Sequence, residues 1–181
     1  MLTEVDYRTS RRHDMQAITR LAHDAGALVI WDLAHSAGAV PIDLKGCGAD
    51  FAVGCTYKYL NGGPGAPAFL YVRPDLQDMV QPALVGWWGH AQPFAFDLNF
   101  APASGIIRQQ CGTQPILSMT ALDAALDVWE GVDMAELHAK AKAQCQLLIE
   151  LVEAQCGGHG LKAAGPRNMD ERGSHVSFHC P

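Results

Sequence analysis

The chain has 181 residues, of which 49% are hydrophobic and 18% charged, and a formal net charge of −6. This is the balance of a folded globular chain of about one domain, and it argues against intrinsic disorder. The negative charge argues against a nucleic-acid partner, and no apolar run approaches the roughly 20 residues that span a bilayer.

The six cysteines, at positions 47, 55, 111, 145, 156 and 180, form no C-x-x-C pair. Residues 1–9 contain no apolar core of a secretory signal, so we expect reduced thiols in a cytoplasmic protein. No ligand spacing typical of zinc is present, so we expect no metal site.

Helix-like and strand-like segments alternate in the first part of the chain. Residues 11–26 place apolar side chains on one helical face and end at Gly26, which suits the position after a helix. Residues 27–31 form a continuous apolar run, typical of a strand buried on both faces of a parallel sheet. Residues 51–56 and 68–72 predict two more strands. We therefore expect an α/β layer, in which the last two strands could pair in either orientation.

The second part of the chain begins with an irregular segment. Residues 82–113 are rich in proline, glycine and tryptophan, and segments this long are uncommon unless functional, so we expect a binding role. Residues 114–129 and 134–152 have helical periodicity and predict two packed helices. Residues 174–180 alternate apolar and polar side chains, which predicts a half-exposed strand of an antiparallel sheet.

Two charged side chains follow successive apolar runs. Asp32 ends the first run, and Lys58 follows the second between Tyr57 and Tyr59. Ligands of open α/β sheets bind outside the carboxyl ends of the strands, so both side chains could surround one small ring. A carboxylate that holds a pyridinium proton and a lysine that forms an imine are what a pyridoxal phosphate (PLP) site needs.

The residues around this pair are compatible with such a site without proving it. The glycines of residues 62–65 would let a phosphate approach the backbone. Taken singly, Asp32 could be a helix cap, His35 a structural histidine and Lys58 a solvated surface charge. Only the combination favours a cofactor site.

Five motifs resemble the kynureninases, PLP enzymes of the aspartate-aminotransferase fold in the class V aminotransferase group. They are WDLAHSAG (31–38), DFAVGCTYKYLNGGPG (50–65), VGWWGH (85–90), GTQPIL (112–117) and RGSHV (172–176). The resemblance implies that residues 1–130 are part of a fold type I large domain, with a mostly parallel sheet and helices. It implies that residues 131–181 begin a small α+β domain. It also implies a homodimer with shared active sites and no nucleic-acid or membrane partner.

The resemblance implies roles for seven residues around the cofactor. Lys58 would carry PLP as an imine and later move protons, and Asp32 would pair with the pyridine nitrogen. Tyr57 would contact the phosphate and relay a proton, and His35 would face the substrate. The remaining phosphate contacts would be Trp87 and, from the neighbouring subunit, Gly112 and Thr113.

The implied reaction is hydrolysis of the Cβ–Cγ bond of L-kynurenine, or of its 3-hydroxy derivative, to an anthranilate and L-alanine in tryptophan catabolism. The alternatives are a cysteine desulfurase-like enzyme, although such enzymes usually have histidine where Tyr57 stands, and an inactive fragment. The family's phosphate-cradling loop and its carboxylate-binding arginine have no counterpart between positions 1 and 181. We therefore expect a fragment that binds PLP weakly on its own.

Overall fold

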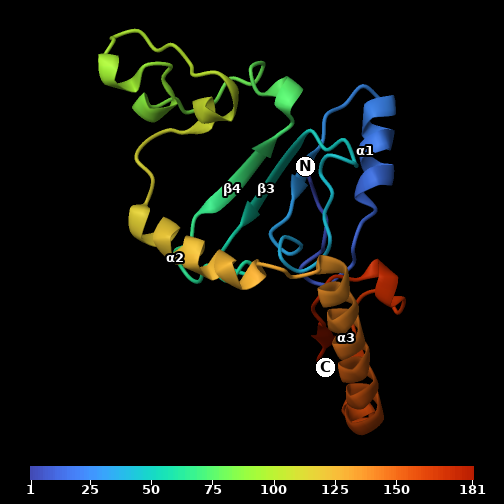
Figure 1. The fold of residues 1–181 in the computed structure, drawn as a ribbon. Coiled ribbons are helices and arrows are strands. Elements are labelled where there is room, and N and C mark those ends of the chain that lie inside the picture. The colour runs from blue at the N-terminus through green and yellow to red at the C-terminus, as the bar shows by residue number, and fades with distance from the viewer.

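The computed structural model describes residues 1–181 as a mixed α/β fold (Figure 1). Its main sheet has the order β1-β2-β3-β4. The strands are β1 (Leu2–Thr3), β2 (Ile30–Asp32), β3 (Phe51–Cys55) and β4 (Ala68–Val72). β1, β2 and β3 are parallel, whereas β4 is antiparallel to β3. The predicted α/β layer is confirmed, and the open question of strand orientation is answered by this last pair.

Helix α1 (Met15–Asp24) connects β1 to β2. It begins where the Asp14 carboxylate accepts a hydrogen bond from the Ala17 amide at 2.9 Å, and it is followed by Gly26 at φ +72°. A residue in this left-handed conformation after a helix is usually glycine. The predicted helix is confirmed but begins later than residue 11, because Arg11 and Arg12 form isolated bridges to other segments.

α1 covers one face of the sheet. Trp31 of β2 is fully buried beneath it, and its Nε1 donates a hydrogen bond to Thr19 Oγ1 at 3.0 Å. Ala52 of β3 pairs in register with Trp31 and is equally buried. The buried core residues are Met15, Val29, Trp31, Leu33, Ala49 and Ala52. This core holds β2 and β3 together and fixes where both strands end.

The opposite face of the sheet is not covered by a helix of this chain. Ile30 and Leu70 lie on it and are 37% and 43% exposed. Successive side chains of a strand point to opposite faces, so the neighbours of Trp31 necessarily turn away from α1. The prediction that residues 27–31 are buried on both faces is therefore wrong for this chain.

The segment 82–113 contains three short 3₁₀ helices and no strand. These are η2 (Trp87–Gly89), η3 (Pro93–Ala95) and η4 (Gly105–Gln109), and they follow η1 (Pro74–Leu76) at the end of β4. Figure 1 shows this yellow-green segment beyond the carboxyl end of β4, at the opposite end of the sheet from α2. The prediction of an irregular segment is confirmed.

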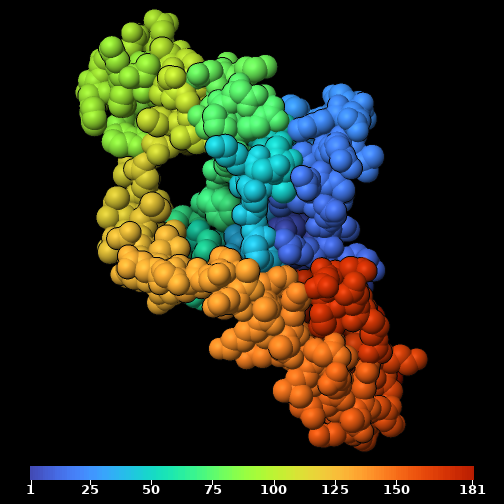
Figure 2. Space-filling view, turned by 45° about the vertical axis from the view of Figure 1, so that its right-hand side comes forward, coloured from blue at the N-terminus to red at the C-terminus, as the bar shows by residue number.

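Helix α2 (Ile116–Leu126) continues into η5 (Asp127–Trp129). No residue of either element is buried. Figure 2 shows an opening between this arm of the molecule and the sheet. A helix is confirmed here, but the prediction that it is packed is wrong for this chain, because no opposing layer covers its apolar side chains.

The last part of the chain is built around α3 (Met134–Cys156), which buries His138, Cys145 and Ile149. It is followed by η6 (Gly157–His159), η7 (Met169–Glu171) and a two-stranded antiparallel sheet of β5 (Lys162–Ala163) and β6 (Phe178–His179). The predicted antiparallel strand is confirmed, although β6 has only two residues. None of the helices is long and apolar enough to cross a membrane.

Candidate active site

Asp32 is the last residue of β2, where the parallel strands β2 and β3 end at the same edge of the sheet. It is half-buried, and its Oδ1 accepts a hydrogen bond from the Ala34 amide at 2.8 Å. Its Oδ2 makes no hydrogen bond within the chain. The turn therefore fixes the orientation of the carboxylate and leaves one oxygen available to an external donor.

Lys58 lies three residues beyond β3, in the turn next to Asp32's strand. Its Nζ is 3.1 Å from Nε2 of His35, and both side chains are half-buried. Nζ also lies 5.4 Å from the ring centroid of Tyr57, a distance at which a cation and an aromatic ring attract each other. The fold thus brings together a lysine and a histidine that are 23 residues apart.

Two tight turns with positive φ support this pair. A Cβ at Gly38 would lie 2.8 Å from the Tyr59 carbonyl oxygen, and Gly38 has φ +82°. The turn after His35 therefore packs directly against the turn that carries Lys58, and only glycine fits this approach without strain. Asn61 also adopts a positive φ of 63°, a conformation that asparagine tolerates better than most residues.

The surroundings lower the pKa of His35. Burial is the main cause, and the positive charge of Lys58 and the proximity of His175 act in the same direction, while Asp32 and Asp6 oppose them. His35 is therefore neutral near pH 7, with one donor and one acceptor nitrogen. A neutral Nε2 can accept a hydrogen bond from the Lys58 amine.

Two aromatic residues that sequence reasoning missed flank His35. The ring centroids of Tyr7 and His175 lie 6.2 and 6.0 Å from that of His35. Nε2 of His175 is also 3.1 Å from the carbonyl oxygen of Tyr7. The motif RGSHV was visible in the sequence, but nothing local indicated that a residue 140 positions away would contact His35.

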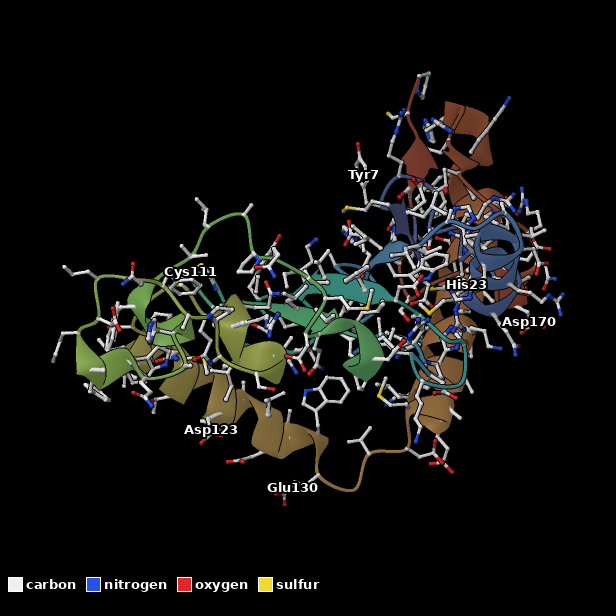
Figure 3. The ribbon with its side chains drawn as sticks, turned by 90° about the horizontal axis from the view of Figure 1, so that it is seen from above. Tyr7, His23, Cys111, Asp123, Glu130 and Asp170 are labelled. Atoms are coloured by element: carbon white, nitrogen blue, oxygen red, sulfur yellow. The ribbon has the colours of Figure 1, made fainter.

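The other three expected site residues lie in a different part of the molecule. Trp87 packs against Trp88 and Phe94, with centroid distances of 4.5 and 5.8 Å. Gly112 and Thr113 follow Cys111, and Figure 3 shows Cys111 far from Tyr7 in the view from above. This chain by itself therefore assembles Asp32, His35, Tyr57 and Lys58, and the roles expected for the other three stay predictions.

The comparisons with known proteins identify the family of the chain. Residues 5–181 match the family model described as aminotransferase class-V, and the chain belongs to that family. Within it, the chain is 55% identical over all 181 residues to the kynureninase of Pseudomonas fluorescens, of which it covers 44%.

Solved structures share the fold at lower identity. The cysteine desulfurase CsdA of Escherichia coli superposes with a TM-score of 0.77 and 20% identity, over 98% of this chain and 42% of that one. A C-DES mutant with glycine covalently linked to its PLP cofactor superposes with a TM-score of 0.79 and 20% identity, over 99% of this chain and 46% of that one. The chain spans less than half the length of each of these proteins.

Proposed function

We propose that the chain provides the lysine half of the active site of a PLP-dependent hydrolase of the kynureninase type. The substrate would be L-kynurenine, cleaved between Cβ and Cγ to anthranilate and L-alanine. The supporting observation is the 3.1 Å contact between Lys58 Nζ and His35 Nε2, next to Asp32, in a chain 55% identical to a kynureninase.

The residues present fit this cofactor. Lys58 offers a primary amine for its aldehyde, and Asp32 Oδ2 is free to accept a hydrogen bond from its ring nitrogen. Cβ atoms built at Gly63 and Gly65 would meet nothing within 4 Å, so a phosphate could reach the backbone of this loop. When bound, PLP supplies an aldehyde that captures amines and a ring that withdraws electrons from the substrate's α-carbon.

The chain's own residues would then have separate roles in the reaction. Asp32 would keep a proton on the ring nitrogen, because a carboxylate oxygen accepts the hydrogen bond that this proton donates. Lys58 would supply the attaching amine and afterwards a base, and His35 would hold the Lys58 amine in place by accepting a hydrogen bond at Nε2. Tyr57, which is 49% exposed, is free to turn its hydroxyl toward the phosphate.

We also propose the assembly that the resemblance implies. A cytoplasmic homodimer would place Gly112 and Thr113 of one copy at the phosphate of the other, with Trp87 as a further phosphate contact. Residues 1–130 would belong to the large domain and residues 131–181 to the beginning of the small one. The exposed apolar side chains of α2 and of segment 82–113 support a contact with another chain in this region.

The test of the amine is covalent labelling. The protein is mixed with PLP, reduced with borohydride and digested, and the modified peptide is identified by mass spectrometry. We expect the label on Lys58 and its loss in Lys58→Ala, whereas Lys45→Ala, which removes an exposed lysine, keeps it. A label distributed over surface lysines in both variants contradicts the assignment.

The test of the reaction is the product. Anthranilate formed from L-kynurenine is measured by its fluorescence, with the chain alone and with chains that supply the remaining length of the relatives. Sulfide release from L-cysteine is measured in parallel, because the fold is shared with cysteine desulfurases. Sulfide without anthranilate would assign the chain to that second activity.

A further inference from the structure

We propose that His175 is a positioning residue of the Lys58 site, which together with Tyr7 orients the His35 ring so that its Nε2 faces Lys58 Nζ. The inference rests on the proposed function only in taking Lys58 as the reacting amine. Neither His175 nor Tyr7 is among the seven residues to which the resemblance assigns a role, although His175 lies in the RGSHV motif.

The first argument is the arrangement of three rings. Tyr7 and His175 contact the His35 ring with interplanar angles of 31° and 51°, and come from opposite ends of the chain. His35 has no hydrogen-bond partner other than Lys58. Its ring orientation is therefore set by these two neighbours, and the 3.1 Å contact depends on them.

The second argument is the hydrogen bond between the two neighbours. A carbonyl oxygen can only accept, so His175 Nε2 carries the hydrogen that is donated to the Tyr7 carbonyl at 3.1 Å. Nδ1 of His175 is then an acceptor, and it is buried without a partner. An apolar side chain would fill this place without an unpaired nitrogen, so packing alone does not account for a histidine here.

The third argument is the support beneath His175. Arg172 is almost fully buried, and its Nη1 donates to the carbonyl oxygens of Pro166 at 2.7 Å and Ala164 at 3.1 Å. Its Nη2 lies 3.4 Å from the His175 carbonyl oxygen. The backbone that carries His175 is therefore held by a rigid side chain rather than by solvent-exposed contacts.

The charges around the two histidines define what a variant should change. Lys58, Asp32, Asp6 and His175 act on His35, and Arg172 and Asp6 act on His175, whose pKa is also lowered by burial. If the Tyr7–His175 pair opens, water reaches His35 and its pKa rises toward 6.5. A protonated His35 carries a hydrogen on Nε2 and cannot accept a hydrogen bond there, so the 3.1 Å contact with Lys58 is lost when His35 is charged.

The experiment compares three variants of residue 175 and its neighbourhood. His175→Gln keeps an N–H for the Tyr7 carbonyl, His175→Leu removes it, and His179→Gln is the matched control at an exposed histidine. The His35 pKa is followed by NMR with ¹⁵N-labelled histidine, assigned by His35→Gln. The reactivity of Lys58 is the initial rate of its modification by trinitrobenzenesulfonate, read by mass spectrometry.

We expect His175→Leu to raise the His35 pKa by about half a unit or more, because burial no longer opposes its charged form. The rate of Lys58 modification should change as well, because the 3.1 Å contact that holds Nζ is loosened. His175→Gln and His179→Gln should stay close to the parent chain in both measurements. A folded His175→Leu with an unchanged His35 pKa and unchanged Lys58 rate overturns the proposal.

If His175→Leu does not fold, the His35 pKa is measured in Tyr7→Ala instead. Tyr7 is 66% exposed, and the variant keeps the main-chain carbonyl while removing the ring. A raised His35 pKa supports the orienting role, and an unchanged pKa overturns it. Neither measurement needs kynurenine or bound PLP. If the His35 pKa shifts as expected but no anthranilate is formed, the proposed function is refuted and the positioning role of His175 is not.

Discussion

Two regions of this molecule have similar apolar content and opposite burial. In residues 1–76, Trp31 and Ala52 are fully buried on the face of the sheet that α1 covers. In residues 82–126, Leu98 is fully exposed and Leu117 is 89% exposed. The first region carries the Lys58 site, and the second carries the expected residues that the chain does not bring to it.

The difference follows from what each region can pack against. In the first, alternation along β2 and β3 presents one apolar face to the apolar stripe of α1, so both are buried by local connections. In the second, α2 has no opposing layer within this chain, as the opening in Figure 2 shows. Exposed apolar surface of this extent typically marks a contact with another chain or segment, so only the first region is self-sufficient.

The largest effect should come from the core of the first region. Trp31→Ala removes a fully buried ring and its hydrogen bond to Thr19, and should lower the free energy of unfolding by about 3–5 kcal/mol. Leu98→Ala, in the second region, should change it by less than about 0.5 kcal/mol. Urea unfolding followed by circular dichroism measures both, and equal losses would erase the contrast between the regions.

A somewhat smaller effect is expected at Asp50, which is fully buried. Its carboxylate accepts hydrogen bonds from Arg73 at 2.6 Å and from the Val29 amide at 2.8 Å, and contacts His23 at 2.9 Å. Asp50→Ala should lower the free energy of unfolding by about 2–3 kcal/mol. Asp75→Ala removes the exposed partner of the same arginine and is the control. Urea unfolding that finds the two variants equal would show that burial of Asp50 adds nothing.

Stability should fall as the pH drops from about 7 to 5, and buried His138 tests the reason. Burial lowers its pKa, so between the folded value and 6.5 the unfolded chain binds more protons than the folded chain. The contribution of neutral His138 to the free energy of unfolding is fully present above pH 6.5. It is lost as the pH falls through the pKa of His138 in the folded chain. Glu4, whose pKa burial raises, has the opposite sign, with a contribution lost as the pH rises through its folded value.

His138→Gln isolates the contribution of this histidine to the pH dependence of stability. The difference in unfolding free energy between the parent chain and the variant, measured in urea across this pH range, should become smaller at low pH. A difference that does not depend on pH would mean that His138 has the same proton affinity in the folded and unfolded chains.

The smallest effect on stability is expected in the second region, with a larger effect on association. Leu117→Ser should leave the free energy of unfolding within about 0.5 kcal/mol, because the side chain is already exposed. It should weaken self-association measured by sedimentation, whereas Thr120→Ser on the same helix should not. Unchanged association would show that this face of α2 is not where copies meet.

Local pattern was sufficient for most elements and for the centre of the candidate site. The ends of residues 27–31 and 51–56 indicated where Asp32 and Lys58 would lie, because parallel strands end at one edge of a sheet. The Tyr7–His35–His175 cluster was out of reach, since its members come from three distant segments. Burial of α2 was predicted wrongly because periodicity reports which face is apolar and not whether anything covers it.

The sequence by itself determined the helices, the three longer strands, the irregular segment and the turn that carries Lys58. These depend on side-chain periodicity, glycine conformations and capping residues, which act within a few positions. The tertiary structure alone decided the antiparallel pairing of β4, the one-sided covering of the sheet and the 3.1 Å contact of Lys58 with His35. Those features depend on which distant segments meet, and that is decided by burial of the whole chain.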